Sequence, residues 1–292
     1  MLTALNRRRY SLLKFLALLS QIRWYNVLLL LIGQYLSALF VFEPSDSWQS
    51  TLADTGTHLT IWSSAFLLVF GFLINSFYDL ETDTINRPKQ TAFERLISQS
   101  TSLRIALLAL IVGLLMAYTV SWQGLLFYGF YAFILWFYSH KVRNIPLVGH
   151  VSAAIIGLLP FFGISVYHQY LSLHTLAFGG LIGLALFSRE LLKDLIMVKG
   201  DTVMGKSTAA SEFGSDQVRL ALIISSGIAW IPAFFTQQWF GFYAQFGMLL
   251  MLVLLSVANT LTLGAKGLRG LRWAHLCYKV VLVIGILTIP FL

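Results

Sequence analysis

The sequence predicts an all-α integral membrane protein, a bundle of nine transmembrane helices formed by a single domain over residues 1–292. Hydrophobic residues make up 58% of the chain, charged residues only 11%, and the mean hydropathy is +0.77. Because a soluble domain carries about 25% charged residues, this chain lacks the polar groups needed to cover a surface in water. An apolar surface is favourable in lipid, where helices satisfy their own backbone hydrogen bonds.

Nine stretches are long and apolar enough to span a bilayer, for which a helix needs about 20 residues. We expect spans over residues 22–42, 58–78, 101–120, 122–140, 145–166, 173–192, 216–236, 240–262 and 272–292. Before the first span, Arg7 to Arg9 precede an apolar run as in a signal peptide, but no small-residue cleavage site follows. We therefore expect a retained first helix with a basic anchor.

The basic residues predict the orientation of these spans. If the N-terminus is cytoplasmic, the outer connections 43–57, 121, 167–172 and 237–239 contain no Lys or Arg. The inner connections then hold Arg87, Lys89, Arg95, Lys141, Arg143, Lys193, Lys199, Lys206, Lys266, Arg269 and Arg272. Because positive charge resists translocation, we expect a multi-pass protein of the inner (cytoplasmic) membrane, surrounded by membrane lipid, with its N-terminus inside.

Charge and cysteine content exclude two other kinds of site. The net charge of +8 is spread over helix ends along the whole chain and forms no basic face of a soluble protein, so we expect no nucleic-acid partner. Cys277 is the single cysteine, which excludes an internal disulfide, and it has no Cys or His partners for a zinc site.

An acidic segment follows the second expected span. Asn75, Asp79 and Asp83 are spaced four residues apart, so on a helix the amide and both carboxylates share one face at the inner membrane boundary. Unpaired carboxylates there repel each other and are costly to desolvate. Mg²⁺ typically binds one or two carboxylates together with substrate phosphate oxygens and water. This segment is therefore a candidate magnesium site.

A second acidic segment follows the sixth expected span. Glu190, Asp194 and Asp201 lie at positions i, i+4 and i+11, near one helical face, and Gly200 is expected to end the helix. Since the spans alternate, both segments emerge on the cytoplasmic side. Facing each other, they could hold two Mg²⁺ ions bridged by a diphosphate that leaves an allylic substrate. The alternative is that these helix-end acids only mark the water interface.

Polar residues near the acidic segments are candidates for binding substrate. We expect Arg87, Lys141 and Lys193 to neutralise diphosphate oxygens, although their default role is to set topology and contact headgroups. Arg23 and Asn26 are three residues apart in the first turn of the first span and share one face. A polar pair inside a span points into the bundle, where Asn26 either binds substrate or hydrogen-bonds a neighbouring helix.

These motifs resemble those of the UbiA superfamily of membrane prenyltransferases over nearly the full length of the chain. That family's first motif reads N-D-x-x-D-x-x-x-D, often followed by N-R-P, and here it is matched by Asn75, Asp79, Asp83, Asn86, Arg87 and Pro88. The second motif in one branch reads R-E-x-x-K-D-x-x-D-x-x-G-D with a later G-x-x-T, matched by Arg189, Glu190, Lys193, Asp194, Gly200, Asp201, Gly205 and Thr208. An early R-x-x-N and a Y-S-x-K stretch are matched by Arg23, Asn26, Tyr138, Ser139 and Lys141.

The resemblance implies an activity and a cofactor. It implies Mg²⁺-dependent transfer of a polyprenyl group from its diphosphate to a lipid or aromatic acceptor within the membrane. The second motif is similar to the branch of geranylgeranylglycerol-phosphate geranylgeranyltransferases, which implies a geranylgeranyl donor, and more loosely to plastid homogentisate prenyltransferases. By the same resemblance Asn75, Asp79, Asp83, Asp194 and Asp201 are catalytic, and the four aspartates are metal ligands, two for each ion.

The sequence departs from the family pattern at three positions. Ser76 and Met197 stand where the family has aspartates, and His150 stands where many relatives have asparagine. One alternative is therefore a degenerate paralogue that binds isoprenoid lipid without turnover. Another is a small-molecule transporter, which would need charged residues deep in several spans and broken helices in matched halves; the chain shows little of either.

Overall fold

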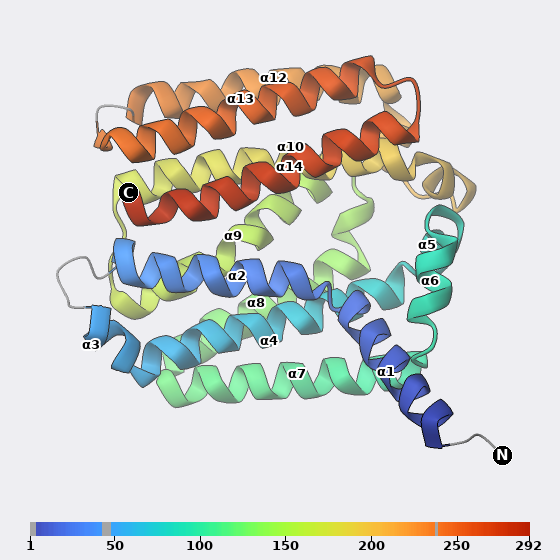
Figure 1. The fold of residues 1–292 in the computed structure, drawn as a ribbon, viewed down its shortest axis with the longest axis horizontal. Helices are drawn as coiled ribbons and strands as arrows, with labels where there is room; N and C mark the ends of the chain where they lie inside the picture. The colour runs from blue at the N-terminus through green and yellow to red at the C-terminus, as the bar shows by residue number, and fades with distance from the viewer. Residues whose placement is uncertain (1–3, 43–47, 237–238) are drawn as a thin grey trace.

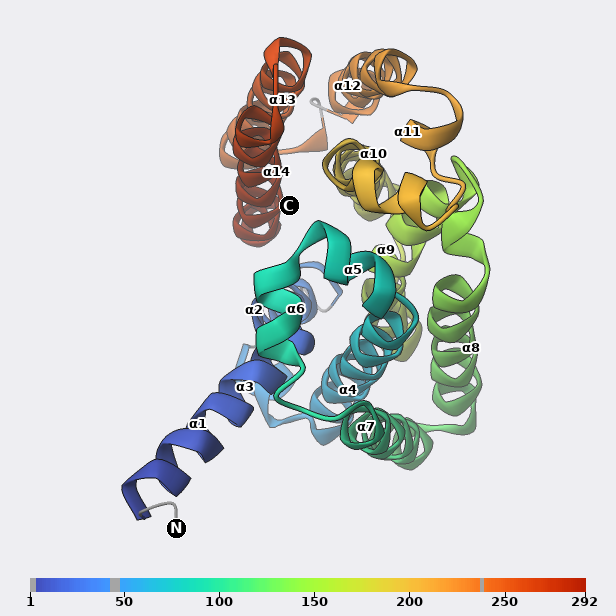
Figure 2. The ribbon, with the colours of Figure 1, turned by 90° about the vertical axis from the view of Figure 1, so that its right-hand side faces the viewer.

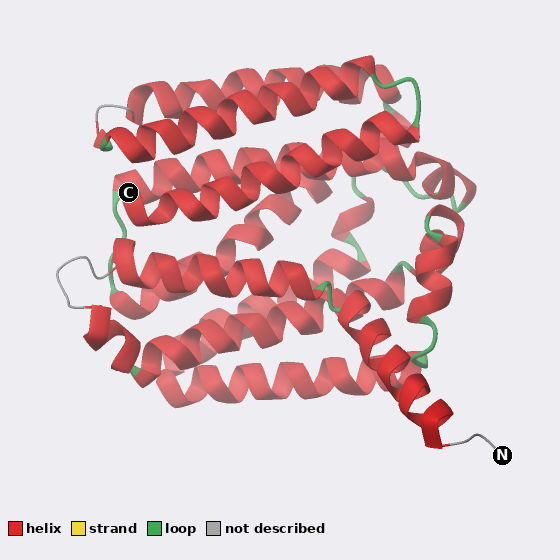
Figure 3. Cartoon of the chain, viewed as in Figure 1, coloured by secondary structure: helices red, strands yellow, loops and turns green. Residues whose placement is uncertain are grey.

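The computed structural model describes residues 4–42, 48–236 and 239–292, and every regular element in these ranges is helical (Figures 1 and 3). The first half of the chain contains α1 (Ala4–Gln21), α2 (Trp24–Ser37), η1 (Ala38–Phe42), α3 (Trp48–Ala53), α4 (Thr55–Tyr78), α5 (Leu80–Asn86), α6 (Pro88–Glu94), α7 (Gln99–Val120), α8 (Trp122–His140) and η2 (Val142–Asn144). The second half contains α9 (Val148–His168), α10 (Leu173–Val203), α11 (Ala209–Glu212), α12 (Ser215–Thr236), α13 (Phe242–Gly264), α14 (Leu268–Thr288) and η4 (Ile289–Phe291).

Seven of the described helices are long and apolar enough to cross a membrane. They cover Trp24–Phe42, Thr55–Tyr78, Gln99–Val120, Val148–His168, Ser215–Phe234, Phe242–Gly264 and Leu268–Phe291. The other two expected spans coincide with α8 and with the first part of α10, which are not among these seven. The all-α membrane bundle is confirmed, whereas the number nine and the cytoplasmic N-terminus stay predictions.

Side-chain caps set the start of several long helices. Asp54 accepts hydrogen bonds from the backbone N–H of Thr57 (2.8 Å) and Gly56 (3.2 Å) at the start of α4. Ser121, in extended conformation between α7 and α8, accepts from Gly124 N (2.9 Å), and Ser172 accepts from Thr175 N (3.1 Å) at the start of α10. Such caps satisfy amide groups that a helix start leaves unpaired, so these helices begin at defined positions.

The long helices pack into two apolar clusters. One joins α4, α7 and α8 around Leu67 and Tyr131, and the other joins α10, α12, α13 and α14 around Leu191, Leu255 and Tyr278. Figure 2 looks along the long helices and shows α4, α7 and α8 on one side and α12, α13 and α14 on the other, with α2, α9 and α10 between them. The two clusters thus hold the walls of the interior described below.

The helix before the first expected span is separate from the bundle. α1 ends at Gln21, and Arg23 takes a left-handed conformation (φ 50°) before α2 begins. Figures 1 and 2 show α1 projecting away at an angle to the long helices. Its last residue is held by hydrogen bonds from Gln21 Nε2 to Glu94 O (3.1 Å) and from Ser102 Oγ to Gln21 Oε1 (2.9 Å). The expected first helix is therefore present, with its own direction.

Candidate active site

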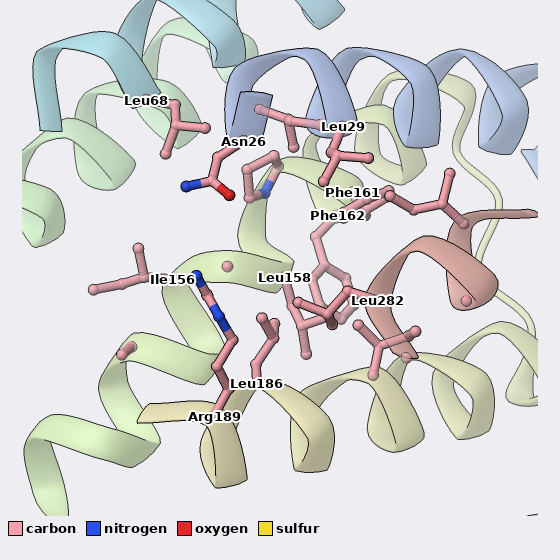
Figure 4. Close-up of a pocket in the computed structure, with 18 of the residues that line it drawn as sticks. Asn26, Leu29, Leu68, Ile156, Leu158, Phe161, Phe162, Leu186, Arg189 and Leu282 are labelled. Carbon is pink, nitrogen blue, oxygen red and sulfur yellow. The ribbon is translucent and has the colours of Figure 1, made fainter. Parts of the chain in front are cut away.

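A cavity of ≈ 320 Å³ lies inside the bundle, and most of its wall is apolar. Figure 4 shows part of this wall, formed by Leu29 of α2, Leu158 and Phe161 of α9, and Leu282 of α14. In the same view the amide of Asn26 and the guanidinium of Arg189 point into one space from α2 and α10. We call this the large cavity.

The charged residues of the large cavity lie at one end of it. Arg23 directly precedes α2, Asn75 is in the last turn of α4, and Arg143 follows α8. Arg189, Glu190 and Lys193 line the cavity from α10, and only Met197 lies further toward the C-terminal end of that helix among its lining residues. The opposite ends of the same helices contribute apolar residues such as Phe42 and Ile289. The cavity is therefore amphiphilic along its length, with an apolar chamber and a charged end.

The charged end continues into a smaller hollow. Tyr138, Arg143, Glu190, Lys193 and Met197 line both spaces. The smaller hollow adds the polar residues Asn144, His150, Asp194, Asp201, Lys206 and Thr208. An apolar chain in the large cavity would thus end next to the second acidic segment.

The first acidic segment is held by cations. Asp79 is 2% exposed and accepts a hydrogen bond from Asn75 Nδ2 (2.7 Å). Its carboxylate also forms an ion pair with Arg143 and another with Lys206, whose Nζ lies 3.1 Å from Oδ1. Arg143 in turn donates to Asn75 Oδ1 (3.3 Å). Since a buried carboxylate is tolerated only when it is paired, these ion pairs compensate for the burial of Asp79.

Asp79 lies between two helices and not inside one. α4 ends at Tyr78 and α5 begins at Leu80, but the backbone hydrogen bonds continue from Asp79 N to Asn75 O (3.0 Å) and from Asp83 N to Asp79 O (2.8 Å). The expected one-sided arrangement of Asn75, Asp79 and Asp83 is therefore kept across the junction. Asp83 is 8% exposed and pairs with Arg87, whose Nε donates to Oδ1 at 3.2 Å.

The second acidic segment is held by a histidine and a backbone amide. Asp194 Oδ2 lies 2.9 Å from His150 Nε2 and accepts from Ala209 N, also at 2.9 Å. Asp201 is 4% exposed, and its burial raises its pKa to about 6, the carboxylates of Asp194 and Asp83 adding to the effect that Arg143 and Lys206 oppose. Asp201 is thus affected by charges from both acidic segments.

A direct contact brings the two segments together. Gly200 N donates to Asn86 Oδ1 (3.0 Å), and a Cβ on Gly200 would lie 2.5 Å from Asn86 Nδ2. Only glycine allows the end of α10 to approach α5 this closely. The expectation that Gly200 ends its helix is wrong, because α10 continues to Val203 and Gly200 serves the contact with α5 instead.

The predicted site residues occupy different places around these spaces. Arg23, Asn26, Asn75 and Lys193 line the large cavity, and Lys193, Asp194 and Asp201 line the smaller hollow. Asp79 and Asp83 line neither, because Arg143 and Lys206 lie between Asp79 and the hollow, and Arg87 pairs with Asp83. Lys141 is exposed and lines neither space. The roles expected of these residues stay predictions.

Sequence reasoning gave too little weight to Arg143 and Arg189. Arg143 was expected among the basic residues of the inner connections but was not chosen to bind diphosphate, yet it contacts Asn75 and Asp79 and lines both spaces. Arg189 lines the large cavity, and Lys206 pairs with Asp79. The second motif includes Arg189 and could have indicated it, whereas the Y-S-x-K match favoured Lys141 and gave no signal for Arg143.

The donors present fit a magnesium ion only as part of a complex with phosphate. In the described part of the chain no three His, Cys, Asp or Glu side chains lie close enough together to hold a metal ion by themselves. The carboxylates come as the two pairs Asp79 with Asp83 and Asp194 with Asp201. Mg²⁺ that binds through one or two carboxylates, phosphate oxygens and water needs no larger cluster, so Asp194 and Asp201, which both line the smaller hollow, fit such an ion.

Comparison with known proteins identifies the family. The model of the UbiA prenyltransferase family matches residues 30–274. The chain belongs to the UbiA prenyltransferase family. It is similar to the digeranylgeranylglyceryl phosphate synthase of Pyrococcus furiosus, with 26% identity over 181 residues that cover 60% of this chain and 63% of the synthase. The chain therefore spans less than two thirds of that relative's length.

Solved structures of UbiA homologues share the fold. The apo structure of a homologue from Aeropyrum pernix has a TM-score of 0.73 at 16% identity and covers 91% of this chain and 96% of its own. A homologue from Archaeoglobus fulgidus bound to GPP and Mg²⁺ has a TM-score of 0.64 at 16% identity and covers 94% and 99%. At these identities the likeness shows the UbiA fold alone.

The three positions at which this UbiA family member departs from the family motifs differ in where they lie relative to the two spaces. Met197 lines both the large cavity and the smaller hollow, so a thioether lies where the family pattern has a carboxylate. His150 also lines the smaller hollow and contacts Asp194. Ser76 is half-buried next to Asn75.

Proposed function

We propose that the protein transfers a polyprenyl group, and specifically a geranylgeranyl group, from its diphosphate to an acceptor within the membrane, with Mg²⁺. The observation that carries this proposal is the continuity of an apolar cavity of ≈ 320 Å³ with a hollow lined by both cations and carboxylates. A prenyl diphosphate has the same polarity along its length. Membership of the UbiA prenyltransferase family and the name of the similar synthase support it.

The apolar chamber would hold the prenyl chain and protect the reaction from water. The C1–O bond to the diphosphate breaks, the diphosphate leaves with the electron pair, and C1 forms a bond to the acceptor, which loses a proton. An allylic cation formed on this path is quenched by water, so an apolar wall such as that formed by Leu29, Phe161 and Leu282 favours transfer. No strong base is required.

The charged end would bind the diphosphate. Arg143, Lys193 and Lys206 line the smaller hollow and can donate to its oxygens, and Arg189 and Asn26 face the large cavity beside it. Charge-assisted hydrogen bonds to phosphate are strong. Asp79 with Asp83, and Asp194 with Asp201, would hold Mg²⁺, which when bound neutralises charge on the leaving diphosphate.

The acceptor is the finer part of the proposal. The name of the similar Pyrococcus furiosus synthase is that of an enzyme for a glyceryl phosphate lipid, which favours a lipid acceptor over an aromatic ring. A second candidate function, lipid binding without turnover, is favoured by Met197 in the wall where a carboxylate would be expected to contact the cation.

One experiment separates these functions. Purified protein is supplied with Mg²⁺, geranylgeranyl diphosphate and either geranylgeranylglyceryl phosphate or homogentisate, and products are identified by mass spectrometry. We expect a prenylated glyceryl lipid from the wild type.

Asp79→Asn should lower the rate by at least about 100-fold, since the ion loses a ligand. Glu81→Gln, an exposed acid two residues away on α5, should leave the rate unchanged. Binding of geranylgeranyl diphosphate without any product from either acceptor would establish the non-catalytic function instead.

A further inference from the structure

A basic groove lies on α14, outside the site described above. It is a hollow of ≈ 370 Å³ lined by Arg269, Arg272, Trp273, His275, Leu276 and Lys279. We propose that this α14 groove binds a membrane lipid whose headgroup ends in a phosphate monoester. The proposal does not depend on prenyl transfer, because binding can be measured without turnover.

Most of the groove lies on the face of α14 opposite the large cavity, whereas His275 and Lys279 lie toward the cavity side. Leu282, Gly285 and Ile289 line the large cavity. The exposed side chains of α14 recur at helical intervals of three and four residues on the other face: Arg269, Arg272, Trp273, Leu276, Val280 and Leu287. A ligand on this exposed face would therefore not compete with a prenyl chain inside the bundle.

The charge of the α14 groove favours a phosphate monoester. Arg269, Arg272 and Lys279 are basic, and no acidic residue lines the groove. Among the described residues, neither arginine forms an ion pair with an acid, while the Lys279 ammonium lies 4.9 Å from the centroid of the Tyr25 ring of α2. A phosphate monoester carries a charge of about −1.5 to −2 at neutral pH, whereas a phosphodiester carries a single negative charge. It also offers oxygens that two guanidinium groups can bind bidentately.

His275 adds a polar atom in need of a partner. Its Nε2 is buried and has no hydrogen-bond partner among the described residues, although the side chain lines the groove. Burying a polar atom without a partner is costly. Because Nε2 has no accessible surface, a phosphate oxygen in the groove could accept a hydrogen bond from it only after the side chain turns toward the groove.

The exposed face of α14 has the polarity of a lipid along its length. Its basic residues are near the start of the helix, and Trp273 is the kind of residue that anchors at a membrane interface. Further along, Leu276, Val280 and Leu287 are 47%, 42% and 60% exposed. From position 276 to 287 a helix rises about 16 Å, which is about half of the hydrocarbon core. A headgroup at the basic end would thus place an acyl chain along this apolar stripe.

Native mass spectrometry of the full-length protein tests the proposal with defined lipids. Phosphatidic acid supplies the monoester, phosphatidylglycerol a phosphodiester of similar size, and phosphatidylcholine a headgroup without net charge. We expect selective retention of phosphatidic acid. Arg269→Ala/Arg272→Ala should weaken that binding about tenfold or more, since hydrogen bonds to charged groups are lost. Arg95→Ala/Arg104→Ala removes two exposed arginines near α6 and α7 and should change it less than about twofold.

Three outcomes would overturn the proposal. An equal loss in both double variants would mean that total surface charge, and not the α14 groove, attracts the lipid. Equal retention of phosphatidylglycerol would remove the monoester assignment. Displacement of phosphatidic acid by soluble glycerol phosphate would show that no lipid chain is needed. Arg269→Lys/Arg272→Lys keeps both charges and should retain more phosphatidic acid than the alanine variant, which separates loss of the site from loss of the fold.

Discussion

At the scale of single residues, the candidate site is organised by cations that hold buried carboxylates. Arg143 and Lys206 both pair with Asp79 and both line the smaller hollow. A diphosphate bound there would offer these cations new partners and leave Asp79 free to bind a metal ion. Because the positive groups are already in place without substrate, little reorganisation is needed when the phosphate binds. On the proposed function, the ion pairs would therefore both compensate for the burial of Asp79 and prepare the diphosphate site.

Asp201 leads to a prediction on pH. Burial raises its pKa to about 6, so below that pH the side chain is mostly protonated and must lose a proton before it can bind a cation. We expect the affinity for Mg²⁺ with inorganic pyrophosphate, measured by calorimetry, to fall as the pH drops below about 6, approaching tenfold per unit. Above that pH, Asp201 should add no further dependence.

Comparison of variants isolates this titration from that of pyrophosphate itself. Asp201→Asn should bind more weakly at high pH and should lack the component of the pH dependence near 6. Asp216→Asn, whose side chain is 94% exposed, should follow the wild type. If wild type and Asp201→Asn showed parallel pH profiles, Asp201 would not take part in cation binding.

At the scale of elements, the sequence predicts helices better than the contacts between them. The expected spans starting at residues 122 and 173 begin where α8 and α10 begin, because Ser121 and Ser172 cap them. Gly200 was expected to end its helix from its intrinsic preference alone. In the structure Gly200 permits a tertiary contact with Asn86, and such contacts override local propensity.

The same limit explains which basic residue reaches the site. Lys141 and Arg143 both follow α8, and the sequence motif favours Lys141. The chain leaves the helical conformation at Lys141 (φ −134°) and forms the short helix η2. This turn leaves Lys141 exposed and brings Arg143 to Asn75 and Asp79. The conformation of a connection decides the outcome, and no periodic pattern predicts it.

The contact between α5 and α10 can be tested by adding one methyl group. Gly200→Ala would place a Cβ 2.5 Å from Asn86 Nδ2, so Asn86 must move and lose its hydrogen bond from Gly200 N. We expect a cost of about 1–3 kcal/mol in the free energy of unfolding and slower prenyl transfer, measured by thermal unfolding and product formation. Gly180→Ala, in the same helix with no atom within 4 Å of the added Cβ, should be neutral or slightly stabilising. Equal behaviour of the two variants would contradict the role of Gly200.

At the scale of the whole molecule, both spaces of the candidate site have their charged residues at the same ends of the helices. The arginines and lysines of the connections lie at these ends, and the opposite connections among the described residues carry none. The positive-inside rule predicts that the charged end faces the cytoplasm. The orientation of the bundle therefore also determines on which side of the membrane the site lies, and a single labelling experiment tests both.

That experiment uses the single cysteine of the chain as its starting point. In a Cys277→Ser background, single cysteines are placed on either side of α7, α8 and α10, and intact cells are treated with a membrane-impermeant maleimide. Thr119→Cys and Tyr170→Cys should be labelled in intact cells, while Lys89→Cys, Lys141→Cys and Lys199→Cys should need permeabilisation. All five positions are exposed on the protein, so a lack of labelling in intact cells shows that the membrane shields the position from the reagent.

Labelling of Lys141→Cys from outside would mean that α8 does not cross the membrane, and labelling of Lys199→Cys from outside would mean the same for α10. Reversal of the whole pattern would place the acidic segments outside, where a soluble cytoplasmic supply of prenyl diphosphate could not reach them, because a charged diphosphate does not cross a bilayer unaided.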